Sequence, residues 1–135
     1  MNLQIIKYQA VKIELESLLQ EEENISSNSS EKTMDLSYTT LFPENDKTTF
    51  NISFNINLTH PNELKLSAVF VAWFKTSDAI DDTFKKSDFP NINAPAIAYP
   101  FLRSLISTIT LNAGYVPVML PSINFVGMHK AKQTT

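Results

Sequence analysis

Residues 93–125 read NAPAIAYPFLRSLISTITLNAGYVPVMLPSINF, and this stretch decides the fold. Its apolar residues recur at steps of three and four, the period of one helix face turned toward a core. Because proline is tolerated in a first turn and kinks a helix interior, we expect the regular helix to begin close to Pro100, after a looser turn. Gly114 then predicts a left-handed stop, and Pro117 and Pro121 predict an extended return. The apolar positions are Ala98, Phe101, Leu102, Leu105, Ile106 and Ile109.

Four stretches before this helix predict β-strands, at residues 5–19, 34–42, 50–59 and 64–74. The third alternates most regularly, with large apolar side chains on one side and asparagine, serine and threonine on the other. The centre of the fourth, residues 68–73, is apolar on both faces, which predicts a strand covered on both sides. Strands joined by turns and followed by helical sequence predict an α+β fold, a four-stranded antiparallel sheet with one main helix packed on one face.

The chain length of 135 residues predicts a single domain, residues 1–135. Residues 21–32, EEENISSNSSEK, are typical of a flexible exposed loop between strands. Residues 129–135, HKAKQTT, are expected to form a short disordered tail.

Residues 77–84 predict a short turn in which Ser77 accepts hydrogen bonds from free amides. A metal site built on Asp78, Asp81 and Asp82 is the alternative. We favour capping because no glycine-containing cation loop accompanies these acids.

The charge and composition exclude several classes of protein. The net charge is −3 and Arg103 is the one arginine, so no basic stripe is available for nucleic acid. No apolar run approaches the roughly twenty residues of a membrane span, and the first residues lack a signal-peptide core, which together predict no membrane insertion and a cytoplasmic location. The absence of cysteine excludes disulfides, thiolate catalysis and cysteine-ligated zinc.

Catalytic and cofactor motifs are missing from the sequence. With glycine at positions 114 and 127 alone, neither a phosphate-binding loop nor a nucleophile elbow can form. His60 and His129 lack the spacing of a zinc site. Glu14 and Glu16 share a strand face, and we interpret them as its solvent side and not as a catalytic pair. We therefore expect no enzyme, no cofactor and no metal.

The stretch 93–125 resembles the helix and following turn of the SecB family, bacterial export chaperones that hold precursor proteins unfolded. A weaker similarity covers residues 3–16, which resemble the first strand of the family, and the middle of the chain is similar only in pattern. The matching positions are Gln4, Ile5, Ile13 and Glu16 in the first segment, and Asn93, Tyr99, Pro100, Phe101, Arg103, Ile106, Gly114, Tyr115, Pro117, Leu120, Pro121, Asn124 and Phe125 in the second.

This resemblance implies an ATP-independent holding chaperone for unfolded or precursor polypeptides, assembled as a homotetramer, a dimer of dimers. It also implies that the helix over residues 100–113 and some strand edges lie between subunits. The expected oligomer contacts are Phe101, Arg103, Leu105 and Ile109.

A holding chaperone needs exposed apolar grooves, which on a protein surface ordinarily mark a binding site. Aromatic rings suit this task, although we expect fewer than half of the candidates to contact a client and the rest to be core. The candidates are Tyr8, Phe42, Phe70, Trp73, Phe74, Phe84, Phe89, Tyr99, Tyr115 and Phe125.

Two departures from the family pattern argue against docking to the export motor SecA. The first strand of the family presents two acids four residues apart to that motor; Glu16 matches one and is the docking candidate, but Lys12 replaces the other. In addition, the sequence after Phe125 leaves little room for the last helix of the family and none for its zinc-binding tail.

Two alternative functions remain on the same sequence. One is a dedicated adaptor or antitoxin-type chaperone that binds a single partner specifically. The other, which we favour less, is a small-ligand-binding or enzymatic domain that shares the sheet.

Overall fold

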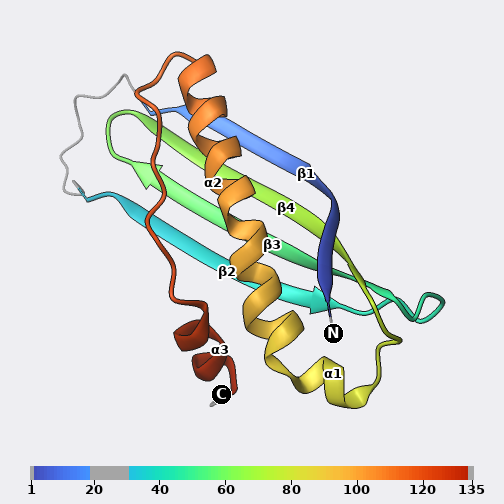
Figure 1. Ribbon diagram of the computed structural model, residues 1–135. Helices are drawn as coiled ribbons and strands as arrows, with labels where there is room; N and C mark the ends of the chain where they lie inside the picture. The colour runs from blue at the N-terminus through green and yellow to red at the C-terminus, as the bar shows by residue number, and fades with distance from the viewer. Residues whose placement is uncertain (1, 19–30, 134–135) are drawn as a thin grey trace.

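A computed structural model describes residues 2–18 and 31–133, so most of the loop expected over residues 21–32 lies outside the described part of the chain. Four strands precede the helices in the chain (Figure 1). The elements are β1 (Leu3–Ser17), β2 (Thr33–Leu41), β3 (Thr49–His60), β4 (Leu64–Thr76), α1 (Asp82–Lys86), a single π-helical turn η2 (Phe89–Asn93), α2 (Ala94–Asn112) and α3 (Phe125–Gln133).

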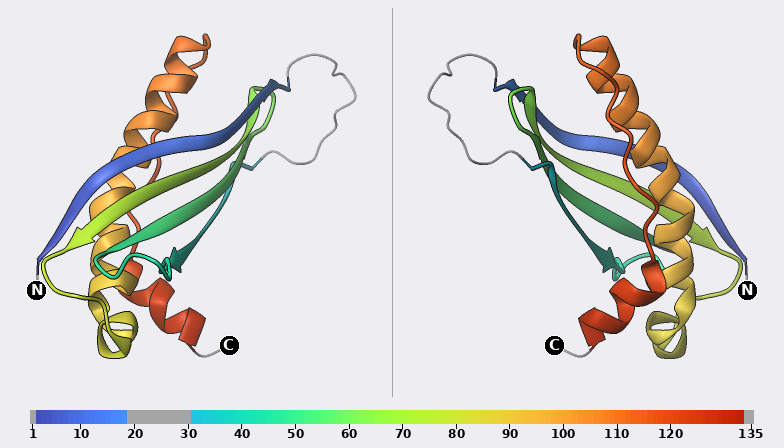
Figure 2. Two further views of the ribbon diagram at one scale, coloured as in Figure 1. Left: turned by 90° about the vertical axis from the view of Figure 1, so that its right-hand side faces the viewer. Right: turned by 90° about the vertical axis from the view of Figure 1, so that its left-hand side faces the viewer.

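The strands form one antiparallel sheet in the order β1-β4-β3-β2. Helix α2 crosses one face of this twisted sheet, and none of the described helices covers the opposite, outer face (Figures 1 and 2). The predicted α+β architecture is therefore confirmed. Two strands, β1 and β2, are edges of the sheet within the described residues.

The core lies between α2 and the inner face of β3 and β4, because every second residue of these strands points toward the helix. The register pairs Phe50 with Phe74, and their rings stack with centroids 5.3 Å apart. The buried strand residues are Phe50, Ile52, Phe54, Ile56 and Leu58 of β3 with Leu64, Leu66, Ala68, Phe70, Ala72 and Phe74 of β4.

The outer face of β4 departs from our expectation. Val69, Val71 and Trp73 point away from α2 and stay half-buried, so β4 is covered on one side and not on both. Apolar residues on both faces identify a central strand, but they do not show whether a second layer is present in the same chain.

The edge strand β1 is more exposed than its alternating sequence predicts. Register shifts between Ile5 and Lys7 and between Ala10 and Lys12 interrupt its pairing with β4, as β-bulges do. Val11 is 52% exposed and Ile13 is 40% exposed. The reason is visible in Figure 2, where the sheet leans away from the carboxyl-terminal end of α2 and leaves this half of β1 without cover.

Helix α2 begins earlier than the proline rule suggested. It starts at Ala94, whose amide donates to the Phe89 carbonyl in the preceding π-helical turn, and Pro95 occupies the first turn. Pro100 lies inside the helix on its exposed side. The expectation of a start near Pro100 was wrong because tertiary contacts hold the first turns, including a hydrogen bond from the Tyr38 hydroxyl to the Asn91 carbonyl at 2.7 Å.

The predicted glycine stop is present after α2. Gly114 has φ +100°, a conformation that L side chains rarely adopt. The amides of Gly114 and Tyr115 donate to the carbonyls of Leu111 and Thr110, which satisfies the helix end. The chain then returns along α2 in an extended segment, residues 116–124 (Figure 1).

Two local expectations need correction. The cap of α1 is Asp81, whose carboxylate accepts from the Phe84 amide at 2.8 Å, whereas the Ser77 hydroxyl accepts from the Asn2 amide at the start of the chain. Residues 129–133, expected in a disordered tail, belong to α3, and the Asn124 side chain caps this helix by accepting from the Gly127 amide at 3.0 Å.

Candidate polypeptide-binding surface

Five of the ten candidate rings are core residues. Phe125 shows why: its ring lies edge-on to Tyr38, Tyr99 and Phe54, at centroid distances of 5.7, 5.5 and 6.4 Å. Such edge-to-face packing suits a closed aromatic cluster and leaves no ring face for a client. The buried five are Phe70, Phe74, Phe84, Tyr99 and Phe125, and the five that keep some exposed surface are Tyr8, Phe42, Trp73, Phe89 and Tyr115.

A first hollow of about 360 Å³ opens beside Phe42, where the chain leaves β2. The Phe42 ring packs on buried Phe50 at 5.7 Å and carries the Lys85 ammonium over its outer side at 5.5 Å. Acids also line the hollow, and the Thr48 amide hydrogen bond holds the pKa of Asp46 below its usual value. The lining residues are Phe42, Pro43, Glu44, Asp46, Lys47, Ile80 and Lys85.

A second hollow of about 450 Å³ lies between the start of β1 and the first turns of the helix. Phe89 forms its aromatic wall and stacks on buried Phe84 with centroids 6.0 Å apart. The lining residues are Leu3, Phe89, Asn93, Ala96 and Ile97, a set without charged groups. An apolar hollow of this kind can accept a side chain from an extended polypeptide.

Trp73 lies apart from both hollows, on the outer face of the sheet. The Lys7 ammonium sits 4.7 Å from its ring centre, a cation–π arrangement that shields part of the ring. Tyr115, just after the stop at Gly114, is half-buried against the core. The candidate rings that stay accessible therefore do not form one continuous surface.

The side of α2 facing β1 holds two of the four expected oligomer contacts. Tyr8, 50% exposed, stacks on Phe101 with centroids 4.5 Å apart, and Leu105 also packs against the core. Arg103 lines a shallow hollow of about 290 Å³ with Ser107 and Met119. Phe101, Arg103, Leu105 and Ile109 are all half-buried in the single chain.

The proposed motor contact Glu16 is exposed on β1, directly across from Lys65 of β4. Nearby, the Lys12 ammonium lies 3.8 Å from the Glu14 carboxylate. The charges on this part of the outer face are therefore mixed and not uniformly acidic.

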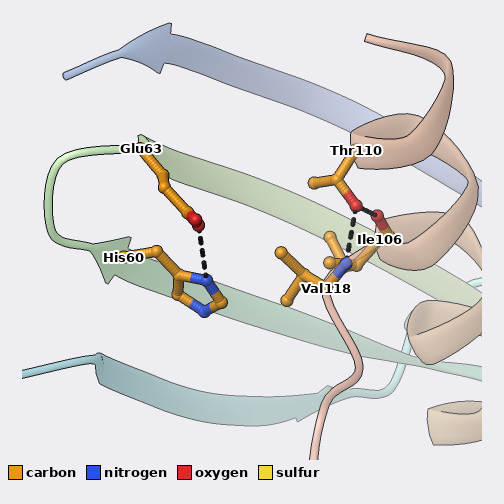
Figure 3. A network of polar contacts seen from close by, with 5 residues as sticks. All are labelled: His60, Glu63, Ile106, Thr110 and Val118. Atoms are coloured by element: carbon orange, nitrogen blue, oxygen red, sulfur yellow. Dashed lines mark hydrogen bonds and ion pairs between the residues drawn. The ribbon is translucent and has the colours of Figure 1, made fainter. Parts of the chain in front are cut away.

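Sequence reasoning missed the polar contacts that hold the segments onto the sheet. Thr110 is fully buried; its hydroxyl donates to the Ile106 carbonyl at 2.8 Å and accepts from the Val118 amide at 2.9 Å (Figure 3). At the β3–β4 turn, the His60 Nδ1 atom lies 3.8 Å from the Glu63 Oε1 atom, and Figure 3 shows the two side chains facing each other. Thr110 occupies an apolar helix face, which was the one available signal.

Two tyrosines and a lysine make further anchors. The Tyr99 hydroxyl donates to the Pro121 carbonyl at 2.6 Å, and burial raises the pKa of both Tyr38 and Tyr99. Lys132 of α3 donates to the Tyr38 carbonyl at 2.8 Å, and partial burial lowers its pKa. These contacts fix α2, α3 and the return segment against the sheet.

Within residues 2–18 and 31–133, no group of three or more histidine or acidic side chains is placed to hold a metal ion. None of the described helices is long and apolar enough to cross a membrane.

The structure thus defines an α+β protein with an open antiparallel sheet, a long covering helix and, at one end, a charged hollow beside Phe42 and an apolar hollow beside Phe89. The family model of the preprotein translocase subunit SecB matches residues 13–135. The chain belongs to the SecB family of protein-export chaperones.

Two relatives are similar over parts of this chain, and one of them is named SecB. Protein-export protein SecB of Rickettsia akari is 28% identical over 103 residues, covering 75% of this chain and 66% of that protein. Uncharacterized protein MJ0357 of Methanocaldococcus jannaschii is 53% identical over 51 residues, covering 38% of this chain and 31% of that protein. The matches thus span less than two thirds of either relative.

Solved structures show the same fold at low sequence identity. The Mycobacterium tuberculosis SecB-like chaperone Rv1957, solved with a ChAD peptide from the Rv1956 HigA1 antitoxin, aligns with a TM-score of 0.62 and 14% identity. The alignment covers 90% of this chain and 89% of that chain. A protein of unknown function from Streptococcus agalactiae aligns with a TM-score of 0.52 and 11% identity.

Proposed function

We propose that this protein is an ATP-independent holding chaperone that binds unfolded or precursor polypeptides in the cytoplasm. Membership of the SecB family carries this proposal, and the accessible rings and the two hollows at one end of the sheet support it. Nonspecific holding requires apolar surface that accepts many sequences, and half-buried rings backed by a rigid core provide it at low entropic cost.

The proposed client contacts are the accessible rings Phe42, Phe89, Tyr8, Trp73 and Tyr115. Phe42 and Phe89 rank first because each borders a hollow and rests on a buried ring. Any one hollow should bind weakly, so several hollows in one assembly would raise the affinity through effective concentration.

We also propose a homo-oligomer, a tetramer built as a dimer of dimers. Its support is the exposed apolar surface of β1 at Ile6, Val11 and Ile13, together with half-buried residues of α2. Glu16 is the candidate contact for an export motor, but the mixed charges around it argue against strong docking to SecA.

The function is tested by light scattering of several unrelated denatured proteins during dilution into buffer. Near-stoichiometric amounts of the purified chain should delay aggregation of each of them. Phe42→Ala and Phe89→Ala should each raise the concentration of this protein that is needed to delay aggregation roughly five-fold. The reason is that removing a contact residue costs about 1 kcal/mol of the free energy of client binding. Val116→Ala, at an exposed position by the far end of α2, is the matched control.

A dedicated chaperone for one partner is the second candidate, favoured by the antitoxin peptide bound to the Mycobacterium tuberculosis protein. In that case the chain would protect one partner and leave the other denatured proteins to aggregate. If wild-type protein protects none of the unrelated denatured proteins, general holding fails and the dedicated chaperone is the remaining candidate.

A further inference from the structure

The outer flank of β2 is an edge of the sheet, since β2 stands last in the strand order of the described residues. An edge strand presents backbone amides and carbonyls to which another extended chain can add. Proteins manage such edges by covering them or by placing lysine there. Here a helix of the same chain contacts this edge strand at Tyr38 and brings a lysine to it.

Helix α3 lies beside β2 (Figures 1 and 2) and places the Lys132 ammonium on this strand. Its Nζ donates to the backbone carbonyl of Tyr38 at 2.8 Å and lies 4.0 Å from the centre of the Tyr38 ring. A charged donor makes this bond stronger than an ordinary one. The acceptor is main-chain oxygen on the edge strand, the kind of atom that an incoming strand would use.

The hold of α3 on the sheet is uneven along its length. At its start, Phe125 is buried and the Asn124 side chain caps the helix. From Val126 onward its side chains are half-buried or exposed, with Val126 itself 45% exposed. A helix of nine residues is not stable in isolation, so its last turns depend on contacts with the sheet such as that of Lys132.

We propose that α3 is a displaceable guard of the β2 edge, and that an extended client segment pairs with β2 after replacing the Lys132 contact on the Tyr38 carbonyl. This inference rests on the proposed function and specifies how the client is held, through main-chain pairing at β2 beside the Phe125 cluster. Phe125 stays in place as the pivot, while the carboxyl-terminal turns of α3 lift away.

Lys132→Met tests the guard because it keeps an unbranched side chain of nearly the same length and removes the charged donor. Lys130→Met is the control, since it removes the same charge from the last turn of the same helix. The readouts are hydrogen exchange of the β2 and α3 amides and the affinity for a fluorescein-labelled, unstructured apolar peptide. Lys132→Met should speed exchange in both elements and tighten peptide binding roughly three- to ten-fold, whereas Lys130→Met should change neither.

Strand pairing is separated from side-chain binding by a second peptide with alternate backbone amides N-methylated. Its side chains are unchanged, so weaker binding reports the loss of main-chain hydrogen bonds and supports the inference. Equal binding of the two peptides, or equal behaviour of Lys132→Met and wild type, overturns it while leaving the holding function intact. If no form binds peptide, the proposed function and the client pairing both fail, and unchanged exchange in Lys132→Met would overturn the guard as well.

Discussion

Thr110 is the polar core side chain whose replacement should lower the stability of this protein most. It lies fully buried, and its hydroxyl both donates to the helix backbone and accepts from the Val118 amide (Figure 3). The second contact ties the return segment to α2. A buried amide without an acceptor costs more than the average hydrogen bond contributes, so this position tolerates few replacements.

Thr110→Val should lower the free energy of unfolding by about 1–3 kcal/mol, because the isosteric side chain leaves the Val118 amide unpaired. Urea denaturation followed by circular dichroism measures the change. Thr108→Val, at an exposed position on the same helix, controls for helix propensity. If both variants lose the same stability, the buried hydrogen bond does not hold the return segment.

Individual residues were predictable where the local pattern determines their environment. The alternation of β3 correctly assigned its phenylalanine and isoleucine side chains to the core. The same reasoning could not separate Phe42 from Phe70 as ring candidates, since exposure depends on which elements cover each ring. No sequence pattern indicated the hydrogen bond of Lys132, because its acceptor, the Tyr38 carbonyl, lies 94 residues away in the sequence.

Among the secondary-structure elements, β1 is the strand whose backbone pairing and apolar burial are least complete. It is an edge strand, its pairing is interrupted by two register shifts, and large apolar side chains remain exposed along it. A single chain rarely leaves such a strand open, and a second copy is the covering that we propose.

Val11→Glu should therefore shift the oligomer toward smaller species without unfolding the chain. The introduced carboxylate would have to be desolvated at the interface, which costs roughly 1–3 kcal/mol and so weakens association about five- to 150-fold. Multi-angle light scattering on a size-exclusion column measures the mass. Val126→Glu, a similarly exposed position on α3, is the control, and a monomeric wild type would contradict the proposed assembly.

The strands and the glycine stop of α2 could be predicted from the sequence to within a few residues, but the start of α2 and the presence of α3 could not. Strand periodicity is local, and it survives packing. The start of α2 and the whole of α3 depend on tertiary partners: the Tyr38 hydroxyl holds the turn before α2, and Phe125 anchors α3 in an aromatic cluster. Such contacts override propensity, which explains why the proline rule and the expected disordered tail both failed.

For the molecule as a whole, two tyrosine hydroxyls join segments that are distant in the sequence: Tyr38 joins β2 to the turn before α2, and Tyr99 joins α2 to the return segment. Tyr38 of β2 donates to the Asn91 carbonyl, and Tyr99 of α2 donates to the Pro121 carbonyl. Both rings are buried, and burial raises the pKa of each phenol above its usual value of 10.0. Ionisation of either phenol would place a charge in the core and abolish its donated hydrogen bond.

The folded protein should consequently lose stability in alkali. Because folding raises both phenol pKa values, their contribution is fully present below pH 10.0 and declines as the pH rises through the higher folded values. Urea unfolding at a series of pH values should show this decline, and Tyr38→Phe with Tyr99→Phe should flatten it. At neutral pH the double variant should lose about 1 kcal/mol for each hydrogen bond. An unaltered alkaline slope would show that neither phenol is responsible.

The pairing of β1 with β4 sets the order in which the sheet can form during synthesis. Leu3 pairs with Thr76, and Ser17 pairs with Leu64, so β1 has no partner until the fourth strand has been made. At about 5–20 residues per second, the ribosome needs on the order of seconds to add the intervening chain. Over that interval β1, with its exposed Ile6, Val11 and Ile13, has no strand to pair with. A protein proposed to hold unfolded polypeptides would thus itself carry an unpaired apolar strand during its own synthesis.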